Sequence, residues 1–232
     1  MNEAAKTDLF GQTIEKRQGV SQNTPSDRTP LPELPKGAFV WPQMLHVEAQ
    51  NALLSHLREA VAVAPLFTPA MPRTGKPLSV QMTNLGDLGW LTDKESGYRY
   101  QSTHPTTGRP WPPIPPMLLD LWKRCAPDAP KPQACLVNYY RDTAKMGLHQ
   151  DKDEQNLEAP VVSISLGDTC LFRLGGTTRG GKTQSFKLHS GDVMMLSGPA
   201  RLAFHGVDRV YPGTSDLLKG GGRINLTLRV VG

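Results

Sequence analysis

Apolar residues recur at three- and four-residue spacing in two stretches of the chain, which is the pattern of one helical face. The first stripe consists of Leu53, Leu54, Leu57, Ala60 and Val61. The second consists of Leu118, Leu121, Trp122 and Cys125. Pro115 and Pro116 precede the second stripe and suit the first turn of a helix, and Pro127 ends it. The pattern therefore predicts two helices before residue 134.

The pattern changes to short apolar runs from Ala134 onward, and turn-forming pairs such as Gly167-Asp168 and Gly175-Gly176 separate these runs. The predicted strands span residues 135–140, 161–166, 170–174, 185–188, 193–196, 202–205 and 223–231. Many short strands at this spacing favour a sandwich or a barrel, with a jelly roll as one option. Helices followed by strands place the fold in the α+β class.

Two other segments lack a clear period. Residues 67–116 are predicted to be loop-like, and they carry the aromatic residues Trp90, Tyr98, Tyr100 and Trp111. Such aromatics either bind a ligand or anchor the loops by packing.

Residues 18–35 are rich in Pro, Ser, Thr and Asn and almost free of large apolar residues. We therefore expect residues 1–38 to be a disordered tail or linker and residues 39–232 to form one domain.

Composition narrows the class of protein. The chain has 232 residues, 38% of them hydrophobic, which is enough for a core. The formal net charge is +5, a mild excess that fits contact with a polyanion but does not require it. No apolar run is long enough to span a membrane, and the N-terminus lacks a signal-peptide pattern. Three widely spaced cysteines argue against a disulfide scaffold. We expect a soluble, cytoplasmic, monomeric protein.

One motif misleads. Residues 176–183 read GTTRGGKT and match the phosphate-binding P-loop pattern. A P-loop needs a following helix whose N-terminal amides face the phosphates. Phe186 and Leu188 instead alternate like a strand, and Gly191 ends the run. The sequence favours a glycine-rich hairpin loop.

A second motif carries chemistry. In His149-Gln150-Asp151 the imidazole and the carboxylate fall on the same side of an extended chain. With His205 they would give two histidines and one carboxylate on one face of a metal, the arrangement of non-haem Fe(II) oxygenases. Three positions on the metal then stay open for a cosubstrate and dioxygen. The plain alternative is a surface turn.

The last predicted strand alternates strictly. Ile224, Leu226 and Leu228 fall on one face, and the other face holds Arg223, Asn225, Thr227 and Arg229. This pattern fits a half-solvated strand, or a polar face inside a barrel where the guanidiniums bind an anion. The dicarboxylate 2-oxoglutarate would serve. Asn138 and Tyr140 share a strand face and could donate hydrogen bonds to the same carboxylate.

The stretches NYYRDTAKMGLHQDKDE, APVVSISLGDTCLFRLGG, SGDVMMLSGPARLAFHGV and GRINLTLRV together resemble the AlkB family of alkylation-repair dioxygenases. The segments MTNLGDLGW and GYRY are similar as well, so the resemblance covers residues 67–231. It implies a double-stranded β-helix, a jelly-roll barrel with flanking N-terminal helices and a nucleotide-recognition lid around residues 67–116. It implies Fe(II) bound by His149, Asp151 and His205. The implied 2-oxoglutarate contacts are Asn138, Tyr140, Arg223, Asn225 and Arg229, and the implied substrate contacts are Trp90, Tyr98, Asp153 and Arg179.

The activity implied by the resemblance is oxidative demethylation of N-alkylated bases such as N1-methyladenine and N3-methylcytosine, with release of formaldehyde. The partner would be alkylated DNA or RNA. A flipped base needs a stacking pocket, which Trp90 and the His149 ring would supply, and the Asp153 carboxylate would favour a cationic base. Two alternatives stay open. One is a 2-oxoglutarate oxygenase that acts on protein or a small molecule, and the other is a jelly-roll binding module without catalysis.

Overall fold

The computed structural model of the chain describes residues 28–141 and 143–232. The helices are α1 (Val47–Val63), α2 (Pro116–Cys125) and a short 3-10 turn (Gly198–Ala200). The first six strands are β1 (Ala38–Trp41), β2 (Gln81–Gly86), β3 (Gly89–Asp93), β4 (Gly97–Gln101), β5 (Ala134–Tyr140) and β6 (Met146–His149). The other strands are β7 (Val161–Gly167), β8 (Cys170–Leu174), β9 (Gln184–Leu188), β10 (Val193–Leu196), β11 (His205–Val210) and β12 (Arg223–Arg229).

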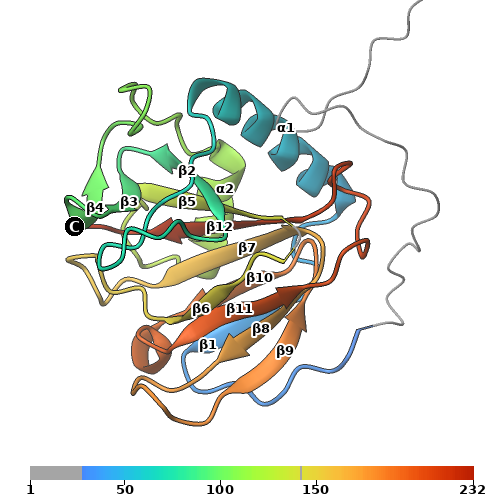
Figure 1. Cartoon of the computed structure of the whole chain (residues 1–232). Coiled ribbons are helices and arrows are strands. Elements are labelled where there is room, and N and C mark those ends of the chain that lie inside the picture. The colour runs from blue at the N-terminus through green and yellow to red at the C-terminus, as the bar shows by residue number, and fades with distance from the viewer. Residues whose placement is uncertain (1–27, 142) are drawn as a thin grey trace, which may run out of the picture.

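Two antiparallel sheets face each other (Figure 1). The larger sheet has the strand order β1-β10-β7-β12-β5-β2, and the smaller has the order β6-β11-β8-β9. Side chains from both sheets share one buried cluster, which includes Leu136 and Met194 from the larger sheet and Phe172 and Val207 from the smaller. This is a jelly roll flanked by helices, so the predicted fold class is confirmed.

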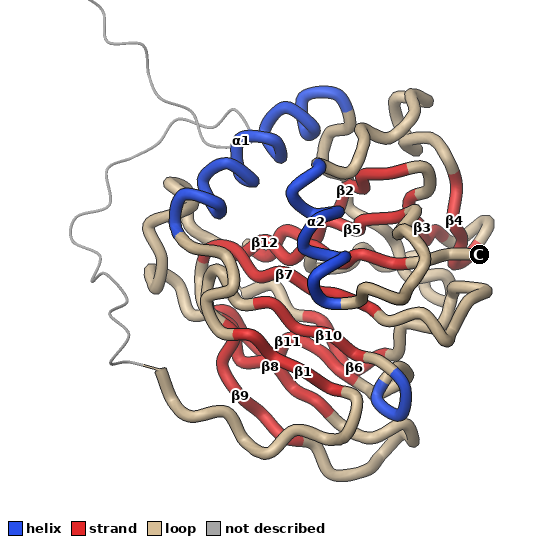
Figure 2. Tube along the Cα trace, turned by 180° about the vertical axis from the view of Figure 1, so that it is seen from behind, coloured by secondary structure: helices blue, strands red, loops and turns tan. Residues whose placement is uncertain are grey.

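The helices cover the outer face of the larger sheet, as Figure 2 shows from behind. Leu53 and Leu57 of α1 and Leu118 of α2 are buried in one cluster with Ile164 and Leu226 of the sheet. The apolar stripes that predicted the two helices are therefore the faces that pack on the sheet. Neither of these helices is long and apolar enough to cross a membrane, among the residues that the structure describes.

Strand β12 lies between β7 and β5 and is buried along its whole length. Its apolar side chains Ile224, Leu226 and Leu228 face the helices. Because alternate residues point to opposite faces, Arg223, Asn225 and Arg229 face the space between the sheets. The half-solvated alternative is thus wrong, and the polar face lies inside the barrel.

The prediction that residues 67–116 are loop-like is wrong in part. Strand β2 forms one edge of the larger sheet, and β3 and β4 form a separate hairpin. The alternation of apolar and polar residues that predicts a strand is not visible in these segments, because buried polar residues interrupt their apolar positions. Thr83 and Asn84 of β2 are fully buried, and the Asn84 side chain bonds the backbone of Trp90 at both its N–H and its carbonyl.

Other boundaries also differ. The strand predicted at 202–205 starts at His205 and continues to Val210, because residues 202–204 belong to the turn that precedes it. The strand predicted at 223–231 ends at Arg229. Strands β1 and β6, of four residues each, were not predicted.

Most of the predicted tail, residues 1–38, lies outside the described residues. Its described part contacts the barrel: Leu31 and Leu34 pack against the buried cluster between the sheets. Arg28 donates to the buried Asp192 carboxylate at 2.8 Å, and Ala38 begins β1. The boundary between tail and domain stays a prediction.

Candidate active site

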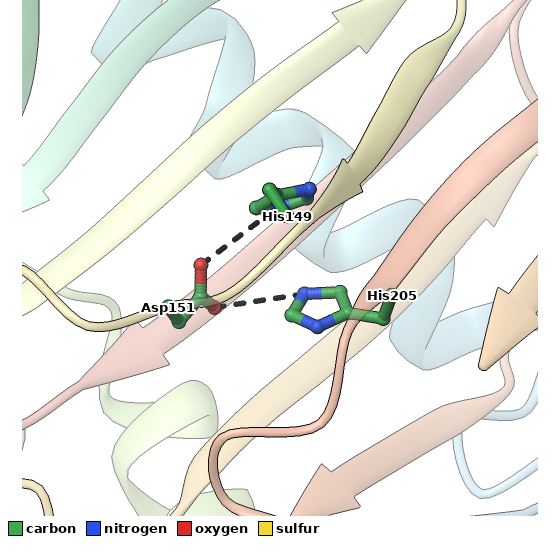
Figure 3. Close-up of side chains that lie close together, drawn as sticks. All are labelled: His149, Asp151 and His205. Carbon is green, nitrogen blue, oxygen red and sulfur yellow. Dashed lines mark ion pairs between the residues drawn. The ribbon is translucent and has the colours of Figure 1, made fainter. Parts of the chain in front are cut away.

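Three side chains converge at the ends of two paired strands of the smaller sheet (Figure 3). His149 ends β6 and pairs with His205, which begins β11, and Asp151 follows β6. The Asp151 carboxylate lies 3.7 Å from Nε2 of His149 and 3.8 Å from Nε2 of His205. One ligand atom from each residue lies within 4.8 Å of the others, so the three could hold a metal ion.

Both imidazoles are oriented by backbone carbonyls. Nδ1 of His149 donates to the Gly147 carbonyl at 2.9 Å, and Nδ1 of His205 donates to the Ala203 carbonyl at 2.9 Å. These bonds fix the proton on Nδ1 and turn the Nε2 lone pairs toward Asp151, as metal-binding histidines require.

The protonation states also suit a metal. Burial opposes ionisation of Asp151, but Arg229, followed by His205, His149 and Arg201, holds its pKa well below the usual range. Burial and the neighbouring His149 lower the pKa of His205 to about 4. At neutral pH the carboxylate is ionised and the His205 imidazole is neutral, which are the forms that bind metals.

Close contact between β11 and β6 sets the spacing of the two histidines. A β-bulge separates the His205–His149 and Val207–Met146 pairs. Gly206 lies inside it, where a Cβ atom would come 2.5 Å from the Met146 carbonyl oxygen and 2.9 Å from that of Gly147. Only glycine fits there without moving backbone.

We therefore expect Gly206→Ala to push β6 away from β11. The cost should be about 1–3 kcal/mol of folding free energy, as for other overpacked sites. Metal binding should weaken as well, because His149 and His205 move apart. Melting temperature and divalent-metal titration measure both effects. Gly147→Ala is the matched control, since nothing lies within 4 Å of a Cβ there. Equal metal affinity in the two variants would contradict this role.

A cavity of about 850 Å³ opens beside the triad. It is lined by eleven of the twelve site residues predicted from sequence: His149, Asp151, His205, Asn138, Tyr140, Asn225, Arg229, Trp90, Tyr98, Asp153 and Arg179. The twelfth is Arg223, which is completely buried beside Tyr140 in the β12–β5 register. The structure thus brings the predicted residues to one place.

Arg223 is buried with donor atoms that an anion could pair with. Its Nη2 donates to Ser165 Oγ at 2.7 Å. Its Nε and Nη1 are buried with no partner among the described residues. A buried guanidinium with free donors is costly unless a carboxylate binds it. These residues therefore fit the carboxylate end of a cosubstrate such as 2-oxoglutarate.

A buried carboxylate orders the loop that leads into Arg223. Asp168 accepts hydrogen bonds from the backbone N–H groups of Thr214 at 2.9 Å, Ser215 at 3.2 Å and Gly222 at 2.8 Å. In the sequence, Asp168 reads only as part of a turn. Its burial next to three backbone donors becomes visible in the structure alone.

Arg229 already has anionic neighbours. Its Nη2 donates to Asp151 at 2.8 Å, and its Nη1 lies 3.6 Å from Glu154. Nε of Arg229 is buried with no partner among the described residues. Arg229 therefore supports Asp151 in this structure and keeps one nitrogen available to a cosubstrate.

The β3–β4 hairpin forms one wall of the cavity. The indole Nε1 of Trp90 donates to Asp153 at 2.7 Å. The ring of Tyr98 stacks on Trp90 with centroids 5.7 Å apart. Across the cavity, Arg179 lies over the Phe204 ring at 5.2 Å. Aromatic surface, a carboxylate and a guanidinium thus surround the opening.

Two charged residues at this site, Glu154 and Arg201, were not predicted from the sequence. Both are buried and paired, with Nη2 of Arg201 3.1 Å from Glu154. Arg201 also donates to the Asp151 carbonyl at 2.5 Å. Glu154 reads in the sequence as one more carboxylate in a charged run, and nothing in the pattern signals its burial. The GTTRGGKT segment is the loop between β8 and β9, as predicted, and a strand follows it.

Comparison with known proteins gives the family. The model of the 2OG-Fe(II) oxygenase superfamily matches residues 37–229. The chain is 56% identical to the alpha-ketoglutarate-dependent dioxygenase AlkB homolog of Caulobacter vibrioides strain NA1000, over 86% of this chain and 90% of the relative. It is 38% identical to the alpha-ketoglutarate-dependent dioxygenase AlkB of Escherichia coli K12, over 79% of this chain and 86% of the relative.

A solved structure agrees. The structure of OsALKBH1 superposes with a TM-score of 0.73 at 32% identity, covering 86% of this chain and all of that one. The superfamily uses Fe(II), 2-oxoglutarate and O₂, which the triad and the buried Arg223 fit. The chain is a dioxygenase of the AlkB family within the 2OG-Fe(II) oxygenase superfamily.

Proposed function

We propose that this enzyme removes alkyl groups oxidatively from the ring nitrogens of damaged bases in DNA, with RNA as a second substrate. The observation that carries the proposal is the single cavity that joins the triad to the Trp90, Tyr98 and Asp153 wall. Relatives that match a shorter part of the chain are named a DNA N(6)-methyladenine demethylase in Arabidopsis thaliana and a tRNA demethylase in Schizosaccharomyces pombe. Their names support nucleic acid as the substrate class.

His149, Asp151 and His205 would hold Fe(II), and their placement at one side of the cavity leaves the metal accessible from the other. Fe(II) held there would supply the oxidation by O₂, in which 2-oxoglutarate would be converted to succinate and CO₂ and the N-linked methyl carbon to a hydroxymethyl group that is lost as formaldehyde. The protein contributes geometry: it holds the alkyl carbon next to the metal and keeps other groups away.

Five residues would bind 2-oxoglutarate. Arg223 would pair with the distal carboxylate through its free Nε and Nη1, held in place by Ser165. Burial raises the pKa of Tyr140, so its hydroxyl stays protonated and can donate to a carboxylate. Asn138, Asn225 and Arg229 line the same cavity and complete the set.

Four residues would bind the nucleic acid. Trp90 and Tyr98 offer aromatic surface to an extruded base, which must leave its stack to reach the metal. The Asp153 carboxylate would favour cationic N1-methyladenine and N3-methylcytosine over undamaged bases. Arg179 lies exposed at the cavity and could contact phosphate. A monomeric state and a cytoplasmic location stay predictions.

Trp90→Ala should weaken repair about ten- to a hundredfold, because stacking of a base on an aromatic ring is worth about 1–3 kcal/mol. Asp153→Asn should harm repair of cationic N1-methyladenine more than repair of a neutral alkylated base. Formation of succinate without nucleic acid should survive in both variants. Trp90→Phe is the control, since it keeps an aromatic ring.

Two paired assays test the effects of these substitutions: succinate formation without substrate, and formaldehyde release from methylated oligonucleotides. If both reactions fall in parallel, Trp90 and Asp153 are structural. If both stay normal, the base does not bind here, and a protein or small-molecule substrate becomes the better candidate.

A further inference from the structure

The β3–β4 hairpin docks on the barrel through one face. Trp90 and Tyr100 are direct cross-strand partners, and Tyr98 lies two residues before Tyr100, so all three side chains point the same way. The hairpin is a sheet of its own, next to β2 (Figure 1). Its attachment therefore depends on what these side chains contact.

Two of the three contact a single short segment of the barrel. Trp90 donates to Asp153, and the Tyr100 hydroxyl donates to Glu154 Oε1. The two acceptors lie two and three residues after Asp151. The hairpin that forms the wall for the base is thus fastened to the same four residues, 151–154, that carry a triad carboxylate.

The two contacts differ in burial. Asp153 is exposed at the cavity, where a substrate can compete with Trp90 for it. Glu154 is buried and also accepts from Arg201 at 3.1 Å. The Tyr100 contact is therefore the one that persists when a base enters and the Trp90 contact is exchanged.

Tyr100 also reaches Asp151 by a second route. Nη1 of Arg229 donates to the Tyr100 hydroxyl at 3.2 Å, while Nη2 of the same guanidinium donates to Asp151 Oδ1 at 2.8 Å. Arg201 bridges Glu154 and the Asp151 carbonyl. Because a guanidinium is planar and rigid, a shift of Tyr100 changes how Arg229 holds Asp151.

We propose that Tyr100 is a positioning residue that couples occupation of the base pocket to the metal ligand Asp151 through Glu154, Arg229 and Arg201. The proposal rests on the proposed function, since it takes a methylated base as the occupant. The coupling acts in both directions: a bound base tightens metal binding, and a bound metal tightens base binding by the same factor.

The test is the linkage between two binding events. Mn²⁺ affinity is measured with 2-oxoglutarate present, once with and once without an oligonucleotide that contains N1-methyladenine. The ratio of the two affinities is the coupling factor. Such factors are typically about 5 to 150, so we expect a wild-type value in that range. For Tyr100→Phe we expect a value near 1, with Mn²⁺ affinity in the absence of DNA close to that of the wild type.

Asp93→Asn is the matched control. It removes the Arg99–Asp93 ion pair of 2.6 Å within the same hairpin and leaves the Tyr100 contacts intact, so it should keep the wild-type factor. Glu154→Gln is a second variant that breaks the network from the barrel side. On its own it should also bring the coupling factor close to 1, because it removes one of the two carboxylate oxygens that accept from Tyr100 and Arg201.

Three results decide the matter. Loss of coupling in Tyr100→Phe and its retention in Asp93→Asn support the proposal. Equal factors in Tyr100→Phe and wild type, or no coupling in the wild type while it releases formaldehyde from the same oligonucleotide, overturn it and leave the proposed function standing. If the wild type releases no formaldehyde, the proposed function fails, and this inference fails with it.

Discussion

His149→Ala is expected to abolish turnover and to weaken metal binding strongly, because one of three protein ligands is lost. The side chain of His149 is 40% exposed, and its Nδ1 bonds only the carbonyl of its own strand, among the described residues. The substitution should therefore cost little folding stability. Divalent-metal titration and formaldehyde release measure the two effects.

Asp151→Ala should also abolish turnover, but unlike His149→Ala it should lower the folding stability. It leaves the buried Arg229 without its 2.8 Å carboxylate partner, and loss of one member of a buried pair typically costs about 3–5 kcal/mol. Asp151→Asn is the better ligand test, since it keeps the shape. His46→Ala and His56→Ala, both outside the triad, should bind metal normally. Unchanged metal affinity in both His149→Ala and Asp151→Asn would contradict the assignment.

Arg223→Met should raise the 2-oxoglutarate concentration needed for turnover by about thirtyfold to a few thousandfold. Losing one partner of a buried charged pair costs about 2–5 kcal/mol, and each 1.4 kcal/mol is about tenfold in affinity. Metal binding should change little. The measurement is succinate formation as a function of 2-oxoglutarate concentration.

Thermal denaturation measures the effect of Arg223→Met on cosubstrate binding independently of turnover. Without cosubstrate, Arg223→Met should be at least as stable as the wild type, because two buried guanidinium nitrogens without partners disappear. With cosubstrate at about a hundred times the wild-type dissociation constant, the wild type should gain about 2.7 kcal/mol and the more weakly binding variant less than about 1 kcal/mol. Arg209→Met, at a side chain 62% exposed, is the charge-matched control. Equal stabilisation of both variants by 2-oxoglutarate would show that Arg223 does not bind it.

The three triad residues that the structure brings together could be picked out from the sequence, because two of them are neighbours in it. His149 and Asp151 are two residues apart, and the strand pairing of His149 with His205 closes the site. The alternation in 223–229 was visible too, but it could not show which face meets water. That answer depends on a second layer: helices cover one face of β12, and the smaller sheet lies beyond the other.

The residues that sequence analysis missed share one physical cause. Glu154 and Arg201 derive their roles from burial and from partners far along the chain. In an isolated sequence, such charged and polar residues look like ordinary surface positions. The hairpin that carries Tyr100 was hidden for a similar reason, since its strands are short and lack apolar alternation.

The place of β12 in the larger sheet has a consequence for how the enzyme is made. Without β12, β7 and β5 would have no common partner strand. The larger sheet would then be divided into the groups β1-β10-β7 and β5-β2. Each half then exposes a strand edge that can pair with another chain. Arg223, Asn225 and Arg229 enter with the strand that closes the gap. A chain whose synthesis stops before residue 223 therefore lacks three residues of the pocket and exposes two unpaired strand edges. The strand that completes the sheet is thus also the strand that completes the pocket.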